Sequence, residues 1–386
     1  MNATLIANTG PTISVAGNIT FSGNATGDLA HVKVFGNGNL NISAHNPPGV
    51  AVGSIEGDGY ILLGSNALTV DANNGSTTFA GHIQDSANHG TLAKTGAGTL
   101  VLSNANTQTG GTRIDGGTLR ASSDGALGGA AQNGTSVIVG PGGTLTLDSG
   151  ATNDYIANRG SLSIATGSTV NLNFSGPPDR VRSLLIDGVT QPPGLYGGSG
   201  SGARNPLPQF TGPGTILATT KAVSRKVQGG AGAFDVDLPL TGTSGVECRS
   251  GDPNGGYQIV VTFANDVTFS FAAVVLGAGS VAGASGSGTS EVTVNLTGVS
   301  NAQIISVGLF DLNDGTETTN LVIPMGILIG DVDGNRVVNA SDVVRAKLQL
   351  GQPVTGSNFR TDVIPNGVIN ASDVFQVKFR LGTSLP

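Results

Sequence analysis

The chain is poor in charged, aromatic and sulfur-containing residues. Charged residues make up 11% and aromatic residues 4% of its 386 residues, with no tryptophan and one cysteine. The single thiol, Cys248, excludes an internal disulfide and is expected to be a small buried side chain. A net charge of −7 without a basic cluster argues against nucleic acid as a partner. No run approaches the roughly 18 apolar residues of a membrane span, so none is expected.

Glycine is abundant instead, with 62 residues, and it punctuates a repeat over residues 1–218. Short alternating segments such as GAGTLVLSN, GGTLRAS and GGTLTLDS follow glycine turns. Leu100, Leu119, Leu145 and Leu162 recur at intervals of roughly 20 residues, a period typical of solenoid coils. The pattern predicts a parallel β-helix over residues 1–218. The proline-rich and glycine-rich stretch 177–218 breaks the rhythm and is expected to cap it.

One stretch of this repeat, residues 90–121, carries a recognisable pattern. It resembles the autotransporter-associated β-strand repeat, and the resemblance runs through Lys94, Gly96, Gly98, Thr99, Leu100, Leu102, Asn106, Thr109, Gly110, Gly111, Thr112, Gly116, Gly117 and Leu119. The resemblance implies a right-handed β-helical passenger region of a secreted or surface-exposed protein, of a kind that is mostly a noncatalytic stalk or adhesin.

Residues 222–329 have a different texture. Six strand candidates, FDVDLPL, YQIVVTFAN, VTFSFAAVVL, SEVTVNLTGV, AQIISVGLFDL and NLVIPMGILI, are joined by turn residues. In the fourth, Val292, Val294 and Leu296 alternate with polar residues, as expected for a strand with one buried face. The pattern predicts an immunoglobulin-like β-sandwich that serves as a spacer.

Residues 330–386 contain one short unit written twice. The first copy reads GDVDGNRVVNASDVVRAKLQLG and the second TDVIPNGVINASDVFQVKFRLG, so Asp331 matches Asp362 and Asp342 matches Asp373. Every acidic residue of this region falls at position 1, 3 or 12 of a twelve-residue loop. This spacing is typical of a loop that wraps a hard cation such as calcium.

The loop positions predict the metal ligands. They are Asp331, Asp333, Asn335, Val337, Asn339 and Asp342 in the first loop, and Asp362, Asn366, Val368, Asn370 and Asp373 in the second, with the two valines offering backbone carbonyls. A short helix is expected after each loop. Its apolar face would comprise Val343, Ala346 and Leu350 in the first copy, and Val374, Val377 and Leu381 in the second.

Both loops depart from the calcium pattern. Arg336 stands at position 6 of the first loop, where a left-handed turn favours glycine and another residue costs roughly 1–2 kcal/mol. In the second loop Ile364 offers no oxygen at position 3, and Pro365 follows with its φ fixed. We therefore expect the first loop to bind calcium and the second to bind weakly or not at all. A helix pair held together without metal is the alternative.

The duplicated loop and helix resemble the type I dockerin family over residues 329–386, and the predicted module comprises residues 330–386. The resemblance implies a calcium-folded docking module that binds cohesin domains of scaffold proteins, often within polysaccharide-degrading assemblies. Partner contacts in this family centre on loop positions 10 and 11. These positions hold Ala340, Ser341, Ala371 and Ser372, the same pair in both halves.

No catalytic group or organic cofactor is predicted. Glu56 and Asp58 could share a strand face as a glycosidase pair, but the glycines around Asp58 indicate a turn. Asp179 with Arg180 and Arg182 favours a salt-bridged cap. The four histidines, His31, His45, His82 and His89, have no metal-binding or nucleophile spacing and are expected to be plain surface residues.

Three functions remain open. The first is a noncatalytic secreted or bacterial cell-surface adhesion protein with a calcium-dependent docking module. The second is a component of a cellulosome-like polysaccharide-degrading system, with a glycan-binding, hydrolase or lyase part on the β-helix or in preceding sequence. The third is an adhesin whose C-terminal repeat is only structural. No signal peptide is expected within this chain, since neither a basic nor an apolar segment follows Met1.

Overall fold

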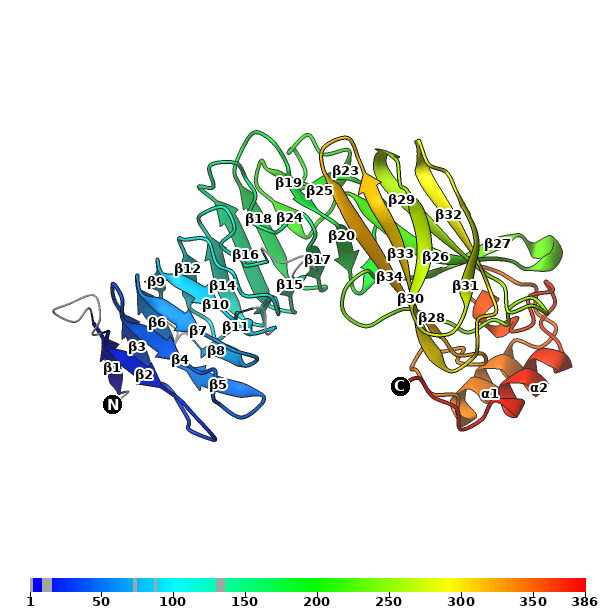
Figure 1. The fold of residues 1–386 in the computed structure, drawn as a ribbon, viewed down its shortest axis with the longest axis horizontal. Helices are drawn as coiled ribbons and strands as arrows, with labels where there is room; N and C mark the ends of the chain where they lie inside the picture. Colours follow the sequence, from blue (N-terminus) through cyan, green and yellow to red (C-terminus); the bar gives the residue numbers. More distant parts are fainter. Residues whose placement is uncertain (1–2, 9–15, 72–74, 87–88, 130–135) are drawn as a thin grey trace. The chain divides into compact units, whose positions relative to one another are not determined.

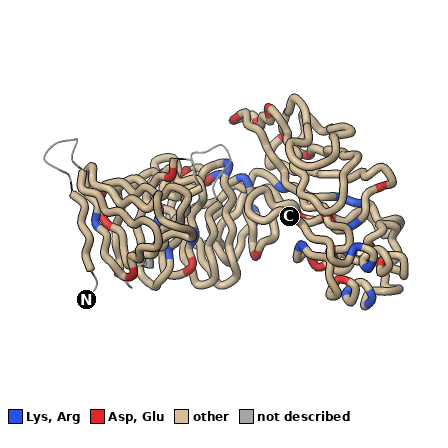
Figure 2. Tube along the Cα trace, turned by 60° about the horizontal axis from the view of Figure 1, so that its bottom comes forward, with Lys and Arg blue, Asp and Glu red and all other residues tan. Residues whose placement is uncertain are grey.

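The computed structural model describes residues 3–8, 16–71, 75–86, 89–129 and 136–386. By its contacts the chain divides into two compact units, Met1–Thr219 and Thr220–Pro386. The described residues are mainly β, and their two α-helices lie near the C-terminus (Figure 1). Charged residues are sparse along the first unit (Figure 2). Among the described residues, every helix is too short or too polar to cross a bilayer.

The first unit is a β-solenoid in which strands stack in parallel from one coil to the next (Figure 1). Its largest sheet has nine strands, β1 (Thr4–Ala7), β3 (His31–Val34), β6 (Ser54–Gly57), β9 (Thr77–Phe79), β12 (Thr99–Leu102), β14 (Gly117–Ala121), β16 (Gly143–Asp148), β18 (Thr169–Asn173) and β24 (Phe210–Thr211).

Two further sheets complete the coils. An eight-stranded sheet contains β5 (Gly49–Val52), β8 (Ala67–Asp71), β11 (Thr91–Thr95), β13 (Thr112–Ile114), β15 (Ser136–Val139), β17 (Ser161–Ile164), β20 (Ser183–Ile186) and β21 (Val189–Thr190). A four-stranded sheet contains β2 (Asn18–Thr20), β4 (Asn39–Asn41), β7 (Tyr60–Leu62) and β10 (His82–Gln84).

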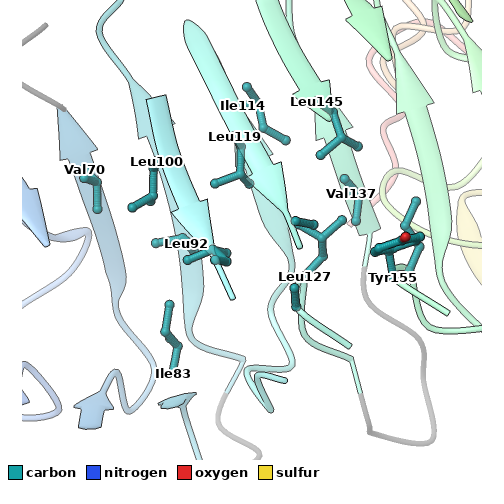
Figure 3. Close-up of a cluster of buried hydrophobic side chains, with 14 of the residues drawn as sticks. Val70, Ile83, Leu92, Leu100, Ile114, Leu119, Leu127, Val137, Leu145 and Tyr155 are labelled. Atoms are coloured by element: carbon teal, nitrogen blue, oxygen red, sulfur yellow. The ribbon is translucent and has the colours of Figure 1, made fainter. Parts of the chain in front are cut away.

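The solenoid core is built from like residues in register. Leu100 pairs with Leu119, Leu119 with Leu145, and Leu145 with Val170. All are fully buried, and Figure 3 shows the three leucines in a row on successive strands. Because side chains alternate along a strand, one residue in two enters this core. A single coil would leave these apolar faces exposed, so each coil depends on its neighbours for burial.

The four recurring leucines do not all stack in one sheet. Leu162 lies in the eight-stranded sheet, where it pairs with Val137 and Leu184, and Val170 takes the next place in the stack of Leu145. The coils differ in loop length, so residues that are evenly spaced in the sequence fall in different sheets. Both positions bury an apolar side chain, and the sequence pattern alone does not tell them apart.

Two polar residues of the repeat pattern link neighbouring coils from inside. The buried Lys94 donates from Nζ to the carbonyls of Thr95, Gly96 at 2.9 Å and Gly116 at 3.3 Å. Asn106 accepts from the Ile83 amide at 2.8 Å and donates to the Ala126 carbonyl at 2.6 Å. Buried backbone groups need partners, and these two side chains supply them where the strands end.

The segment predicted as a cap begins with one more coil. Strand β20 pairs in parallel with β17, and only then does the chain reverse into β21. Tyr196, Phe210 and Ile216 join the solenoid core. A separate four-stranded sheet pairs β19 (Asp179–Val181), which precedes β20, with three later strands, β25 (Thr215–Ala218), β22 (Gly194–Gly197) and β23 (Asn205–Pro206).

The second unit begins with two sheets that enclose one core, and we call residues 220–329 the two-sheet region. The five-stranded sheet contains β27 (Ala233–Asp237), β26 (Thr220–Val227), β29 (Tyr257–Val267), β32 (Thr289–Thr297) and β31 (Ser280–Ser285). The four-stranded sheet contains β28 (Val246–Glu247), β34 (Thr318–Ile327), β33 (Gln303–Asn313) and β30 (Phe271–Leu276).

The six strand candidates of residues 222–329 coincide with β27, β29, β30, β32, β33 and β34. Val292, Val294 and Leu296 of β32 face the shared core together with Val307 and Ile323, as their alternation predicts. Strands β26, β28 and β31 were not predicted from the sequence. Cys248 follows β28 and is fully buried, as expected, and burial raises the pKa of its thiol to about 11.

Two helices and two short 3-10 turns complete the unit: α1 (Ala340–Leu348), α2 (Ala371–Phe379), η1 (Gly229–Ala231) and η2 (Phe359–Thr361). Val343 and Ala346 of α1, with Val374 and Val377 of α2, are buried in a third core cluster. The predicted third members, Leu350 and Leu381, lie beyond the helix ends and are 42% and 48% exposed. The helices therefore stop earlier than their apolar spacing predicts.

Candidate metal centre and docking surface

The first loop gathers three carboxylates. One oxygen from each of Asp331, Asp333 and Asp342 lies within 4.8 Å of the others, although the residues span a loop and the first turn of a helix. Asp331 and Asp342 are fully buried, and Asp333 is partly buried. Three negative charges held this close repel one another unless a cation or protons intervene.

Backbone amides fix the orientation of these carboxylates. Asp331 accepts at Oδ1 from the amides of Gly334 at 3.0 Å and Asn335 at 3.1 Å, and at Oδ2 from Arg336 at 3.0 Å. Asp342 accepts from the Asp333 amide at 3.2 Å and from the Asn339 amide at 2.9 Å. The second contact closes a capping box with Asn339, so helix α1 itself aims Asp342 into the loop.

Burial raises the pKa of Asp331 to about 6. The bond from the Arg336 amide and the charge of the Arg360 guanidinium lower this pKa, whereas the carboxylates of Asp342 and Asp333 raise it further. A divalent cation would relieve both the burial cost and the repulsion. The donor set is also chemically suited to calcium, which takes carboxylate, amide and carbonyl oxygens. Asp331, Asp333 and Asp342 would hold the ion, with Asn335, Val337 and Asn339 as neighbouring oxygen donors in the same loop.

The left-handed turn expected at position 6 is present in both loops. Arg336 has φ 76° and Gly367 has φ 85°. Arginine rarely adopts this conformation, so Arg336 strains the first loop. Among the described residues, its guanidinium makes two long contacts, with Ser244 Oγ and the Pro386 carbonyl, both at 3.4 Å.

Arg336→Gly should tighten calcium binding by up to about tenfold, because glycine removes a strain of roughly 1–2 kcal/mol that is imposed when the loop orders around the ion. Titration calorimetry on the intact protein measures this change. Arg336→Gln is the matched control, since it removes the charge but keeps the side chain that causes the strain. Weaker binding by the glycine variant would show that the loop register is wrong.

The second loop repeats the backbone scaffold with fewer ligands. Asp362 accepts from the amides of Asn366 at 3.4 Å and Gly367 at 2.9 Å, and Asp373 accepts from Ile364 and Asn370, each at 2.9 Å. Burial raises the pKa of both Asp362 and Asp373. Position 3 contributes no oxygen, because Ile364 stands where the first loop has Asp333. The second loop therefore fits a divalent cation less well than the first.

The four predicted partner-binding residues all lie on the surface. Ala340, Ser341, Ala371 and Ser372 are exposed in the first turns of α1 and α2. Ser341, itself position 11 of the first loop, also donates from Oγ to Asp333 Oδ2 at 2.9 Å, so it contacts one of the predicted metal ligands directly. In the second loop Ile364 stands at the position that matches Asp333, so the corresponding serine, Ser372, is not offered a carboxylate there.

The outer helix faces carry apolar residues that sequence reasoning missed. Val344 and Leu348 of α1 are 54% and 72% exposed, and their counterparts Phe375 and Phe379 of α2 are 67% and 68% exposed. The two phenylalanine rings stack with centroids 6.3 Å apart. We call these four residues the apolar helix face. A short helix that packs on one side requires a single apolar face. Both helices carry apolar residues on a second face as well, and this was the signal in the sequence that indicated an exposed apolar surface.

The other sequence candidates have structural partners. Glu56 forms an ion pair with Lys33 at 3.0 Å, and Asp58 accepts from the Gly36 amide at 2.8 Å, beside an open hollow of about 490 Å³. Asp179 is fully buried and accepts from the Ile156 amide at 3.3 Å. Burial raises its pKa well above the ordinary value, and Asp154 adds to the effect.

The histidines divide between surface and inter-coil contacts. His31 shares a hydrogen bond with Ser54 Oγ at 2.8 Å, and His82 stacks on Tyr60 with ring centroids 5.6 Å apart. His45 contacts the carbonyls of Ala25 and Asn46. Within the part of the chain that the structure describes, no group of three metal-binding side chains includes a histidine.

Comparisons with known proteins agree with this architecture at both ends. Residues 92–121 match the Passenger-associated-transport-repeat family, and residues 329–382 match the Dockerin type I domain family. Part of the chain is similar to Adhesin BmaC autotransporter of Brucella suis biovar 1 (strain 1330), with 33% identity over 155 residues. That alignment covers 38% of this chain and 4% of the adhesin. No solved structure matches the chain.

These findings confirm both resemblances inferred from the sequence. The chain combines a β-solenoid that carries a passenger-type repeat with a C-terminal module similar to type I dockerins. It spans only a small fraction of the adhesin that it resembles.

Proposed function

We propose that this protein is a noncatalytic adhesion or docking protein, secreted or on a cell surface, whose C-terminal module binds a cohesin-like domain when its first loop holds calcium. The apolar helix face is the observation that carries the proposal. Four large apolar side chains, Val344, Leu348, Phe375 and Phe379, lie exposed on two adjacent helices. Each helix thus exposes two apolar side chains one turn apart, and the two phenylalanine rings stack on each other. Exposed apolar surface of this kind is typical of a protein-binding surface.

The position of this face supports calcium dependence. Asp342 both belongs to the carboxylate cluster and caps α1, so an ion in the first loop would fix the helix that presents Val344 and Leu348. The exposed pairs Ala340–Ser341 and Ala371–Ser372 start the same two helices. A partner that recognises the helix face would therefore bind the calcium-ordered module more tightly than the calcium-free one.

Leu348→Asp with Phe379→Asp should weaken binding to purified cohesin domains, including any encoded in the same genome, by at least about thirtyfold, because each change buries a charge at the interface. Surface plasmon resonance with calcium and with a chelator measures this. Val322→Asp is the control, since Val322 is 44% exposed on the two-sheet region. Absence of binding to every cohesin domain tested would reject the docking proposal.

The finer features belong to the same proposal. We take the solenoid coils to be right-handed, the two-sheet region to be an immunoglobulin-like spacer, and the domain boundaries to be 1–218, 222–329 and 330–386. The alternative, a glycan-binding or glycan-cleaving solenoid, has the hollow beside Glu56 and Asp58 in its favour. Both carboxylates there already have structural partners, which favours docking over catalysis.

A further inference from the structure

The second loop of the module rests on the two-sheet region. Gln228, which follows β26, is fully buried, and its Nε2 donates to three oxygens: the Phe359 carbonyl at 2.9 Å, and the Asp362 carbonyl and Oδ2, each at 3.0 Å. Asp362 is position 1 of the second loop. A side chain from outside the module thus binds Asp362, the residue that supplies the first ligand in a calcium-binding loop.

The orientation of this amide is determined by its surroundings. Its nitrogen meets three oxygens, so the reversed amide would place oxygen against oxygen. The Oε1 atom is buried without a hydrogen-bond partner among the described residues. Burying an amide oxygen without a partner has a cost, and that cost is offset only if the three donated bonds stabilise the fold.

The first loop has an equivalent support from within the module. Arg360 donates from Nη2 to the Asp331 carbonyl at 2.9 Å, as Gln228 does to the Asp362 carbonyl. The two loops therefore share one design, with a donor behind position 1. They differ in where the donor comes from, since Arg360 belongs to the module and Gln228 does not. They also differ in the number of ligands, because the first loop gathers three carboxylates and the second has Ile364 where the first has Asp333.

Close backbone packing fixes the second loop further. A Cβ on Gly229, the residue after Gln228, would collide with the Asn366 carbonyl. The Ser250 amide donates to the Val363 carbonyl at 2.7 Å, and the Phe234 and Phe359 rings stack with centroids 5.4 Å apart. The second loop is thus packed against the two-sheet region along its first half.

From these contacts we infer that the second loop is a metal-free loop, held in the calcium-loop conformation by the two-sheet region through Gln228. Its donor set does not fit a divalent cation, and a protein donor supplies the order that an ion would supply elsewhere. The inference rests on the proposed function in that it concerns the second half of the same docking module. It makes the two-sheet region part of the docking unit, and it leaves only one half of the duplicated surface under calcium control.

Hydrogen exchange of residues 359–373 in the intact protein, with calcium and with a chelator, tests the inference. The parent protein should protect the Ile364, Asn366 and Gly367 amides equally in both conditions. Gln228→Leu should speed their exchange on the order of tenfold to a hundredfold, since it removes bonds to a charged group, and calcium should not restore protection. Gln258→Leu is the control, because the side-chain amide of that glutamine donates to Asn295 Oδ1 on the surface.

Protection that requires calcium in the parent, or that calcium restores in Gln228→Leu, would overturn the inference. Should that variant fail to fold, Ile364→Asp with Pro365→Gly gives an independent readout. Calorimetry should then find one calcium ion bound to the parent and two bound to the variant, and two ions bound to the parent would overturn the inference. A different result would reject the proposed function. In that case the protein would bind neither calcium nor a cohesin domain, while the exchange pattern of the second loop would remain as expected.

Discussion

Replacing Asp331 and Asp342 together by alanine should abolish the calcium-dependent ordering of residues 329–386. The two residues are fully buried and supply two of the three carboxylates that lie within 4.8 Å of one another. Asp333 alone, partly exposed and paired with Arg345 at 3.5 Å, is too weak a ligand set to retain a hard cation. Circular dichroism and titration calorimetry of the intact protein, with and without calcium, measure the loss.

The duplicated unit supplies the matched control. Asp342 also caps helix α1, so its removal destabilises the helix by about 1 kcal/mol whether or not an ion is involved. Asp373 caps α2 in the same way, and Asp362 matches Asp331. Asp362→Ala with Asp373→Ala should therefore lower stability yet leave the calcium response of the first loop in place. Identical melting with and without calcium in the parent protein would refute the metal assignment.

Glu247→Ala should destabilise the second unit by roughly 3–5 kcal/mol, the cost of leaving a buried charge without its partner. Glu247 and Arg249 are both fully buried and form two contacts of 2.8 Å, and Ser224 Oγ donates to Glu247 at 2.6 Å. Burial opposes ionisation of Glu247, but the neighbouring guanidinium outweighs it and lowers the pKa of the carboxyl.

Scanning calorimetry should show the transition of the second unit falling on the order of 10 °C in Glu247→Ala, while the solenoid transition stays unchanged. Glu247→Leu with Arg249→Met is the informative comparison. If the large loss comes from an unpaired guanidinium, removing both charges should recover much of the stability. A single variant that melts with the parent protein would contradict the burial of this pair.

The same ion pair connects the two-sheet region to the docking module. The Arg249 guanidinium lies over the Phe359 ring at 5.0 Å, and Phe359 also contacts Gln228 through its carbonyl. Loss of Glu247 should therefore loosen the second loop as well as the two-sheet region. Hydrogen exchange in residues 359–373 would report this, and the solenoid would serve as the internal reference.

The architecture could be read from the sequence wherever the evidence is local or periodic. The solenoid follows from apolar residues that recur beside glycine turns, because every coil solves the same packing problem with the same residues. The leucine spacing did not assign residues to sheets, and Leu162 stacks in a different sheet from Leu145. Strand β26 was not predicted from the sequence, because polar residues such as Ser224 and Lys226 are buried along it and interrupt the apolar pattern.

By itself the sequence determined the candidate ligands of both loops, the missing side-chain oxygen at position 3 of the second loop and the left-handed turn at Arg336, since all three depend on spacing within one short segment. Only the tertiary structure decided what supports the second loop. Gln228 and Asp362 are 134 residues apart, and no local pattern marks a glutamine as the donor to a distant carboxylate. Contacts between residues so far apart in the sequence form only when the two-sheet region and the module pack against each other. The packing of these two regions determines which side chains meet.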